Sequence, residues 1–541
     1  MSTYGIYTRS LLALICLTGC SSNEIKQTDT VLSERQEANF NFSNDIKTLD
    51  PRMSQGITAS NLLYMLFEGL VKTDKDGKML PAIAEKIIVS PDMTTYTFIL
   101  KDTNWSNGDP VRAQDFEYSW KSQLNPDMKA PHSYMLEPIK GASQALRGAK
   151  TNQVGITAID DKTLKVELEK PTPYFLQMCA SPAYFPVNQK WTESHPDFKI
   201  DGQFACVSNG PFALISYVPQ DSVQLRKNSK YWDSASVKLH RVVCTFVDDN
   251  QAFAKFTSGS LDWVGNPFSS LSTEQILQMQ KTASLTSTPA ASTQFIRVNV
   301  TKPPFSNTKM RRAFGYCIDL QGIINKAMDS DETVATSFVP KCLGLVEKPY
   351  FTPHDLELAR KLYEEALAES GLTQQTLPPI TLSYIGSDRS RLIVSVIKDS
   401  IKEAFNIDVI LQEETVKSLS QKLLTKDYTL ALSTWLADYL DPSSFLNVFA
   451  TDNNGVNNTG WTNPTYTKLL QNASVEMDEG ARFKTLSDAE DILMQDMPIL
   501  PLFHLTFTYA TSDDLQGDLL SPLGIMDITT AFRVNKKPNK T

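Results

Sequence analysis

Residues 355–370 read DLELARKLYEEALAES, and residues 380–384 read ITLSY. In the first stretch, apolar side chains recur at the 3.6-residue period of a helix, at Ala359, Leu362, Tyr363, Ala366 and Leu367. Asp355 is suited to be its N-cap, and Gly371 follows where a glycine commonly ends a helix. The second stretch alternates apolar and polar residues, which indicates a strand.

The same alternation of helix and strand continues downstream. The periodicity predicts a helix over 389–405, a strand over 407–411, a helix over 481–495 and a strand over 498–503. This order predicts an α/β domain with a crossover unit. The first 270 residues are instead rich in short alternating runs typical of half-buried strands, at 96–100, 164–168, 222–226 and 241–246.

Length and charge exclude several classes of protein. A chain of 541 residues predicts about three or four domains. Because 52 Lys and Arg stand against 61 Asp and Glu, the net charge is -9, which argues against nucleic acid as the main partner. With 41% hydrophobic and 21% charged residues, the composition indicates a large globular protein.

The N-terminus has the features of an export signal. Arg9 precedes the apolar run of residues 11–17, which is too short to span a bilayer, and Leu17-Thr18-Gly19-Cys20 follows. This tetrapeptide resembles a bacterial lipobox. We therefore expect a lipoprotein signal peptide over 1–19 and a lipidated Cys20 that begins a flexible, polar tether over 20–34. The alternative is an ordinary signal peptide with an incidental cysteine.

Motifs of catalysis and metal binding are missing from the sequence. It contains no GxSxG, no GxxxxGK[ST] and no HExxH, and its five histidines are dispersed. Five scattered cysteines lie beyond Cys20, and they form no CxxC pair for zinc: Cys179, Cys206, Cys244, Cys317 and Cys342. Because their number is odd, at least one is unpaired, and we expect most of them to be buried free thiols. We expect no enzymatic activity, no cofactor and no metal. The alternative is glycosidase-like acid/base catalysis by a carboxylate pair such as Asp438 and Asp441. Chance pairs are common among 61 acids, however.

A collinear series of short strings covers nearly the whole chain after Cys20: residues 48–51, 66–71, 80–84, 96–101, 105–116, 173–175, 209–212, 228–232, 302–307, 311–314, 359–363 and 435–439. Together they resemble the oligopeptide-binding proteins of peptide ABC transporters, in the periplasmic dipeptide/oligopeptide-binding family. Most of these strings set turns or supply core aromatics such as Phe67, Trp105, Phe116 and Trp120.

The resemblance implies an α/β, bilobal fold like that of periplasmic binding proteins of type II, cluster C, with an extra inserted domain and mixed sheets joined by hinge strands. Domain I would comprise residues 35–57, 182–287 and 506–541. Domain II would comprise 58–181 and domain III 288–505, and the lobes would close over a ligand.

The string Trp435-Leu436-Ala437-Asp438-Tyr439 carries the implied ligand chemistry. In the resemblance, Asp438 takes the free α-ammonium of a peptide, and main-chain groups of Thr434 and Leu436, beside Trp435, pair with its backbone as with an added strand. A dehydrated ammonium needs an opposite charge, and backbone pairing gives affinity without reading side chains. The alternative is that Asp438 only caps the turn before Asp441-Pro442.

The resemblance also implies an opposite wall at Asp45, Ile46 and Lys47, and a pocket border at Asn458. It departs from enteric relatives where they carry a tryptophan and two arginines, because this chain has Val416, Leu423 and Leu432 there. A clamp for a ligand carboxylate is therefore missing or relocated. The candidate replacements are cations that usually face solvent: Arg389, Arg391, Lys422 and Lys426.

The resemblance implies an extracytoplasmic solute-binding lipoprotein, in the periplasm or at the cell surface. It would capture short oligopeptides as a monomer and deliver them to an ABC permease, with no nucleic acid as partner. The same scaffold serves murein peptides, dipeptides, nickel complexes and oligosaccharides, so a murein peptide or another small ligand stays open. A surface enzyme or an adhesin on the same anchor is the remaining alternative.

Overall fold

The computed structural model describes residues 32–535, except 75–76, 283–284, 328–330, 453–454 and 518. The predicted signal peptide over 1–19, Cys20 and most of the tether over 20–34 lie outside these residues, as do residues 536–541.

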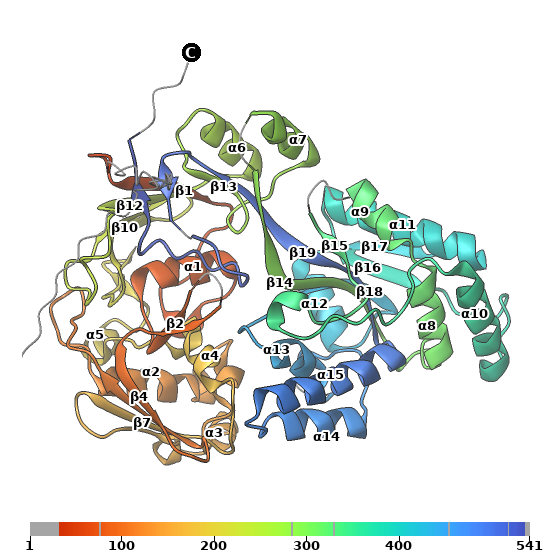
Figure 1. The fold of residues 1–541 in the computed structure, drawn as a ribbon, viewed down its shortest axis with the longest axis horizontal. Helices are drawn as coiled ribbons and strands as arrows, with labels where there is room; N and C mark the ends of the chain where they lie inside the picture. The colour runs from red at the N-terminus through yellow and green to blue at the C-terminus, as the bar shows by residue number, and fades with distance from the viewer. Residues whose placement is uncertain are drawn as a thin grey trace, which may run out of the picture.

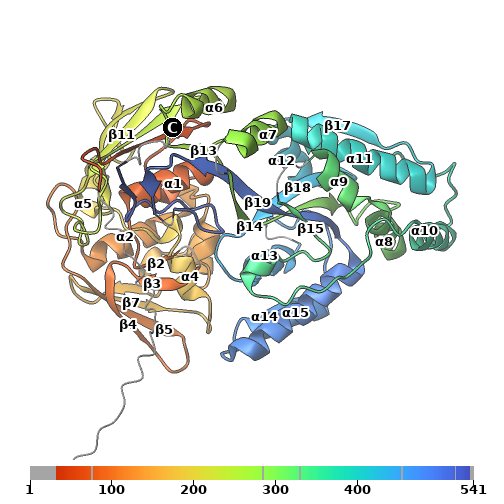
Figure 2. The ribbon, with the colours of Figure 1, turned by 45° about the horizontal axis from the view of Figure 1, so that its top comes forward.

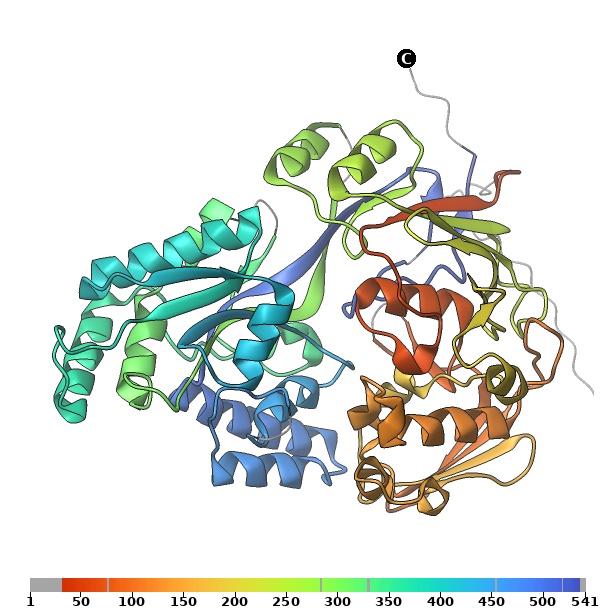
Figure 3. The ribbon, with the colours of Figure 1, turned by 180° about the vertical axis from the view of Figure 1, so that it is seen from behind.

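Two separate hydrophobic cores divide the molecule into two bodies. The first core is built mainly from residues 38–268 and 507–531, and the second mainly from 291–503. Figures 1 and 3 show the two bodies side by side, joined through the long strands β14 (Leu285–Val298) and β19 (Ile499–Thr511). The expected bilobal α/β architecture is therefore confirmed.

The first body holds two four-stranded sheets. One has the order β1-β12-β11-β10, with β1 (Glu37–Phe42), β12 (Arg241–Phe246), β11 (Ser222–Lys227) and β10 (Phe212–Val218). The other has the order β4-β5-β7-β6, with β4 (Ala84–Val89), β5 (Thr95–Leu100), β7 (Thr163–Glu167) and β6 (Ile156–Ala158). Strand pairs β2 (Val71–Thr73) with β3 (Met79–Pro81), β8 (Lys199–Ile200) with β9 (Gln203–Phe204), and β20 (Leu515–Gln516) with β21 (Phe532–Arg533) complete its strands. Its helices are α1 (Ile57–Leu66), α2 (Ala113–Gln123), α3 (Ala142–Leu146), α4 (Phe175–Cys179), α5 (Gln189–Ser194) and α6 (Asp249–Thr257).

The second body is organised on a seven-stranded mixed sheet of order β13-β19-β14-β18-β16-β17, with β15 beside β19. The further strands of this sheet are β13 (Trp263–Gly265), β15 (Thr333–Val334), β16 (Thr381–Ile385), β17 (Ile410–Glu414) and β18 (Leu430–Leu436). Of these, β13 lies on the first body, where Trp263 packs in the first core. Helix α7 (Thr273–Thr282) lies beside α6 of the first body, where Met279 clusters with Ala252 (Figure 1). The helices of the second body are α8 (Thr308–Cys317), α9 (Leu320–Ala327), α10 (Leu356–Ser370), α11 (Asp388–Phe405), α12 (Val416–Leu424), α13 (Ser443–Leu446), α14 (Pro464–Ala473) and α15 (Glu479–Asp496).

Strands β14 and β19 run antiparallel from one body into the other, as Figure 2 shows from a second angle. Their pairing extends from Leu285↔Ala510 to Arg297↔Ile499, with irregularities between Pro289 and Thr293 and between Gln294 and Phe295. The domain boundaries predicted at 287/288 and 505/506 fall within these two strands. Because this strand pair connects the two bodies, bending of β14 and β19 is the simplest way for the bodies to move relative to each other.

Several sequence predictions are confirmed in detail. Helix α10 begins after Asp355, whose carboxylate accepts the Leu358 N–H at 3.0 Å, and ends at Gly371 with φ 64°. The aromatics predicted as core, Phe67, Trp105, Phe116 and Trp120, are at most 1% exposed. All five described cysteines are free thiols, and Cys179, Cys244 and Cys317 are buried.

The strand predicted over 407–411 is wrong in its bounds. Helix α11 ends at Phe405, and Asn406 adopts the left-handed conformation with φ 54°. Residues 407–409 then connect this helix end to the strand and are not part of it. Pairing with β16 starts only at Thr381↔Ile410, and β17 therefore runs from Ile410 to Glu414.

Three of the family-like strings meet in one joint inside the first body. Asn209 accepts the Glu68 N–H at 3.1 Å and donates to the Glu68 carbonyl at 2.9 Å. The carboxylate of Glu68 accepts from the Tyr231 hydroxyl and the Trp232 indole, both at 2.6 Å. A side chain at Gly210 would lie 2.7 Å from the backbone at Leu66 and Phe67. These three strings therefore have a structural role in the first body.

Candidate functional site

The last part of β18 has one side without a strand partner. On one side, β18 pairs with β14 from Leu430↔Val298 to Leu436↔Ser292. On the other side, β16 pairs only with Leu430 and Ala431, and among the described residues no strand continues beyond them. The outer side of β18 is thus an open edge over residues 432–436.

The direction of the backbone groups along this edge follows from one bond. The Ala437 N–H donates to the Ala291 carbonyl at 2.8 Å, so Ala437 faces β14. Because main-chain groups alternate along a strand, Trp435 also faces β14, whereas Thr434 and Leu436 face the open edge. The Trp435 carbonyl accepts from the Ser292 hydroxyl at 2.9 Å, in agreement with this alternation. Thr434 and Leu436 are the two positions that the sequence predicted for main-chain contacts.

Asp438 lies just past the end of this edge, fixed at its own backbone. Its N–H donates to the Ser444 hydroxyl at 2.8 Å, and the Trp435 indole donates to the Ser444 carbonyl at 3.0 Å. The side chain keeps part of its surface exposed, yet the surrounding protein removes enough water to raise its pKa to about 6. A carboxylate in such a place gains most from a cationic partner.

The alternative role for Asp438 was to cap the turn beside Asp441-Pro442, but the side chain that accepts a backbone N–H in this turn is that of Asp441. Asp441 accepts the Ser443 N–H at 2.9 Å and thus closes the turn before α13. The Asp438 carboxylate instead accepts from the Tyr134 hydroxyl at 3.1 Å.

Tyr134 is a site residue that sequence reasoning missed. It lies in a short 3-10 turn, Ser133–Leu136, of the first body and reaches across to Asp438 of the second. Its hydroxyl lowers the pKa of Asp438 against the larger effect of burial. A single tyrosine in a turn carries no pattern, and 304 residues separate it from its partner, so no local signal marked it.

Asp45, Ile46 and Lys47 form part of a wall on the first body. The Tyr217 hydroxyl donates to the Asp45 carboxylate at 2.6 Å, and the Ile46 N–H donates to the same oxygen at 2.9 Å. Asp45 and Lys47 are exposed, whereas Ile46 is buried. A pocket of about 360 Å³ begins here, which is large enough for a small ligand or a side chain. It is lined by residues 44–48, 53 and 55–59.

Asn458, predicted at the pocket border, forms a hydrogen bond through its backbone. It has φ 55°, and its carbonyl accepts from the Tyr428 hydroxyl at 2.8 Å. Among the described contacts, none joins Asn458, Asp45 or Lys47 to Asp438, so the structure brings Asp438 together with Tyr134 and the β18 edge only.

Each candidate cation for a ligand carboxylate already has an acidic partner. Arg391 pairs with Glu413 at 2.8 Å, Arg389 with Glu332 at 2.6 Å and Lys426 with Asp452 at 2.7 Å. Lys422 pairs with Glu414. Leu432 is buried, Leu423 is half-buried and Val416 is exposed, so apolar side chains occupy the positions of the arginines and the tryptophan.

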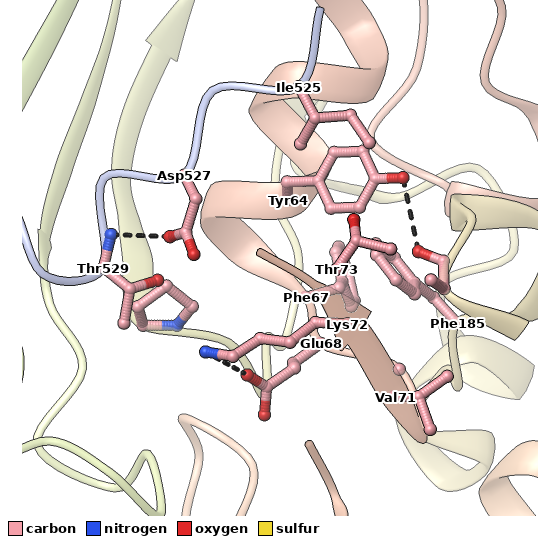
Figure 4. Close-up of a pocket in the computed structure, with 13 residues that line it drawn as sticks. Tyr64, Phe67, Glu68, Val71, Lys72, Thr73, Phe185, Ile525, Asp527 and Thr529 are labelled. Atoms are coloured by element: carbon pink, nitrogen blue, oxygen red, sulfur yellow. Dashed lines mark hydrogen bonds and ion pairs between the residues drawn. The ribbon is translucent and has the colours of Figure 1, made fainter. Parts of the chain in front are cut away.

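A second pocket, drawn in Figure 4, lies where α1 and β2 meet the C-terminal segment. Lys72 pairs with Glu68 at 3.7 Å, and the Tyr64 hydroxyl donates to the Ala180 carbonyl at 3.3 Å. Its volume of about 40 Å³ has room for two or three water molecules. None of the predicted site residues lines it. It belongs to the joint around Glu68.

In the part of the chain that the structure describes, no three His, Cys, Asp or Glu side chains cluster as metal ligands. Within the same residues, no helix has the length and apolar character needed to cross a bilayer.

Comparisons with known proteins give a consistent result. Residues 78–457 match the model of the bacterial extracellular solute-binding proteins, family 5 Middle. The chain is 33% identical to the oligopeptide-binding protein OppA of Bacillus subtilis (strain 168), over 98% of this chain and 99% of that one.

Two solved structures of the murein tripeptide-binding protein MppA are also similar. The structure from Escherichia coli has a TM-score of 0.82 at 28% identity, covering 94% of this chain and 100% of that chain. The unliganded open form has a TM-score of 0.76 at 28% identity, covering 94% of this chain and 99% of that chain.

Proposed function

The chain belongs to the bacterial extracellular solute-binding proteins of family 5, and we propose that it captures short oligopeptides and delivers them to an ABC permease. The observation that carries this proposal is the open edge of β18, which runs into the partly dehydrated carboxylate of Asp438. It catalyses no reaction, and its task is to hold and release a ligand.

We propose that the peptide lies along the edge as an added strand. The outward main-chain groups of Thr434 and Leu436 pair with its backbone, so that affinity does not depend on its side chains. Its α-ammonium meets Asp438, where the Tyr134 hydroxyl already marks one hydrogen-bonding direction. Asp45, Ile46 and Lys47 supply the opposite wall, and Asn458 borders the pocket.

The far end of the ligand has no dedicated cation. Arg389, Arg391, Lys422 and Lys426 each hold an acidic partner, and breaking such a pair offsets what a ligand carboxylate gains. We therefore propose that the N-terminal end of the peptide is recognised by charge and the C-terminal end is not, which suits peptides of several lengths.

A murein peptide is the second candidate ligand. The similarity to the two structures of the murein tripeptide-binding protein MppA, with TM-scores of 0.82 and 0.76, supports it. A released murein tripeptide has a free α-ammonium of its own, so both classes of ligand can meet Asp438, and identification of the bound ligand is needed to tell them apart.

We also propose that Cys20 carries lipid and anchors a monomeric protein at the periplasmic or outer face of a bacterial membrane. The apolar run followed by Leu17-Thr18-Gly19-Cys20 supports this. The three domains predicted from the sequence are part of the same proposal. Detergent phase partitioning of the expressed full chain should place the parent in the detergent phase and Cys20→Ser in the aqueous phase. An aqueous parent would refute the anchor.

The ligand assignment is tested by calorimetric titration of the mature protein with tri- to pentapeptides. We expect Asp438→Asn and N-acetylation of the peptide each to weaken binding by about two orders of magnitude, since either leaves a dehydrated charge without its partner. The matched control is Asp427→Asn, which changes an exposed acid of the same body. Full affinity in both tests would refute the role of Asp438. Mass spectrometry of the ligand released by denaturation would separate oligopeptides from murein peptides.

A further inference from the structure

Tyr439 belongs to the second body by its place in the chain, but its side chain packs in the core of the first. It follows Asp438 and is 7% exposed. Its ring stacks on that of Tyr174, with centroids 5.2 Å apart and planes at 2°. Tyr174 lies beside α4 of the first body, so the stack joins the two bodies directly.

Buried charges of the second body reinforce this contact. The Arg482 guanidinium lies 5.3 Å from the centre of the Tyr174 ring. Two hydrogen bonds, at 2.7 and 2.6 Å, tie Arg482 to Asp441, and both side chains are 5% exposed. Since Asp441 also closes the turn before α13, the segment that presents Tyr439 has a fixed shape.

On the first body, two further segments meet the neighbours of Tyr439. The Tyr184 hydroxyl donates to the Met135 carbonyl at 2.6 Å and so holds the turn that carries Tyr134. At the tip between β2 and β3, a side chain at Gly77 would come within 2.5 Å of Leu440. Contacts with the first body therefore run through Asp438, Tyr439 and Leu440 in succession.

We propose that Tyr439 is a positioning residue for ligand capture: it is the plug that holds the two bodies together and thereby keeps Tyr134 on Asp438. The bodies are otherwise connected through β14 and β19, so opening about these strands must withdraw the Tyr439 ring from its seat. The same segment thus carries the ligand's charge partner and the contact that reports closure. Its effect on peptide affinity rests on the proposed function, whereas its effect on closure does not.

The simplest test measures the distance between the bodies without ligand. Spin labels at Asp102→Cys in the first body and Val346→Cys in the second, in a Cys342→Ser background, report it by double electron–electron resonance. Asp102 and Val346 are strongly exposed, and Cys342 is the exposed native thiol. We expect one narrow, short distance for the parent and a longer, broad distribution for Tyr439→Ala.

Conservative and matched variants separate a plug from ordinary core packing. Tyr439→Phe keeps the ring and loses only a hydroxyl whose partner, Ser443, is in its own body, so it should behave as the parent. Tyr363→Ala removes a buried, stacked tyrosine that lies wholly in the second body. It should lower the melting temperature and leave the distance unchanged.

Binding provides the second measurement. Tyr439→Ala should weaken peptide affinity by about tenfold or more, because the competent arrangement becomes a minor population. Its binding should also titrate at lower pH, because withdrawal of the first body returns water to Asp438, and this effect is larger than the loss of the Tyr134 hydrogen bond. Tyr174→Ala should reproduce both effects from the other side if Tyr439→Ala fails to fold. The double variant should be no worse than either single one.

An unchanged ligand-free distance in both Tyr439→Ala and Tyr174→Ala would overturn the plug. If the distance changes but no peptide binds even to the parent, the plug stands and the proposed ligand falls. If peptides bind and the distance is unaffected, the proposed function stands and the plug falls.

Discussion

Acidification should release the ligand within a narrow range of pH, because burial raises the pKa of Asp438 to about 6. One pH unit below this value, about one tenth of the carboxyl is ionised. If only the carboxylate holds an ammonium, the apparent affinity at pH 5 should be about tenfold lower than at pH 7. An aspartate of ordinary pKa would stay ionised over this range and give almost no change.

The assay is calorimetric titration of one tripeptide with the mature protein at half-unit steps from pH 5 to pH 7. The α-amino group of the peptide keeps its proton throughout, so the protein supplies the change. Asp438→Asn should bind weakly at every pH and lose the dependence. Tyr134→Phe should move the midpoint upward, because it removes the hydroxyl that favours the charged form. An affinity that stays constant to pH 5 in a folded protein would refute the reasoning.

Three further predictions concern stability. Burial raises the pKa of Glu490 to about 7, so the stability linked to this group is full near pH 4 and is lost as the pH rises through 7. The free energy of unfolding of Glu490→Gln in urea should therefore rise by about 2 to 3 kcal/mol relative to that of the parent between pH 5 and pH 8. Arg533→Met leaves the buried Asp262 and Asp514 without their cation and should cost about 3 to 5 kcal/mol in the same assay, and a loss below about 1 kcal/mol would contradict this. Gly210→Ala places a carbon 2.7 Å from backbone atoms that cannot move aside and should lower the melting temperature by several degrees, whereas Gly259→Ala, where the new carbon meets open space but the backbone is strained, should cost only about 1 kcal/mol.

Local patterns predicted the fold because their physical causes are local. The caps of α10 need only Asp355 and Gly371, and the apolar period between them, so the helix was predicted within a residue. The start of β17 depends instead on where the chain finishes turning at Asn406, and that turn left no mark in the hydrophobic alternation.

The candidate site divides in the same way. Asp438 and its neighbours could be predicted because the string Trp435-Leu436-Ala437-Asp438-Tyr439 resembles a motif of the oligopeptide-binding family. Tyr134 and Tyr174 were invisible as partners, since each contact joins residues more than 250 positions apart and involves one side chain only. Glu490 was also missed: it is an acid on the buried side of α15, where it accepts the Phe338 and Val339 N–H groups.

The open side of β18 has a consequence for protein quality as well. An unpaired strand edge is a template for any extended chain, including the same segment of another copy, and such pairing leads to domain swapping and aggregation. Tyr134 and Tyr174 of the first body contact Asp438 and Tyr439, just past the end of this edge. A shortened chain that lacks residues 58–181 would lose both contacts beside the unpaired edge, and we expect it to accumulate as oligomers.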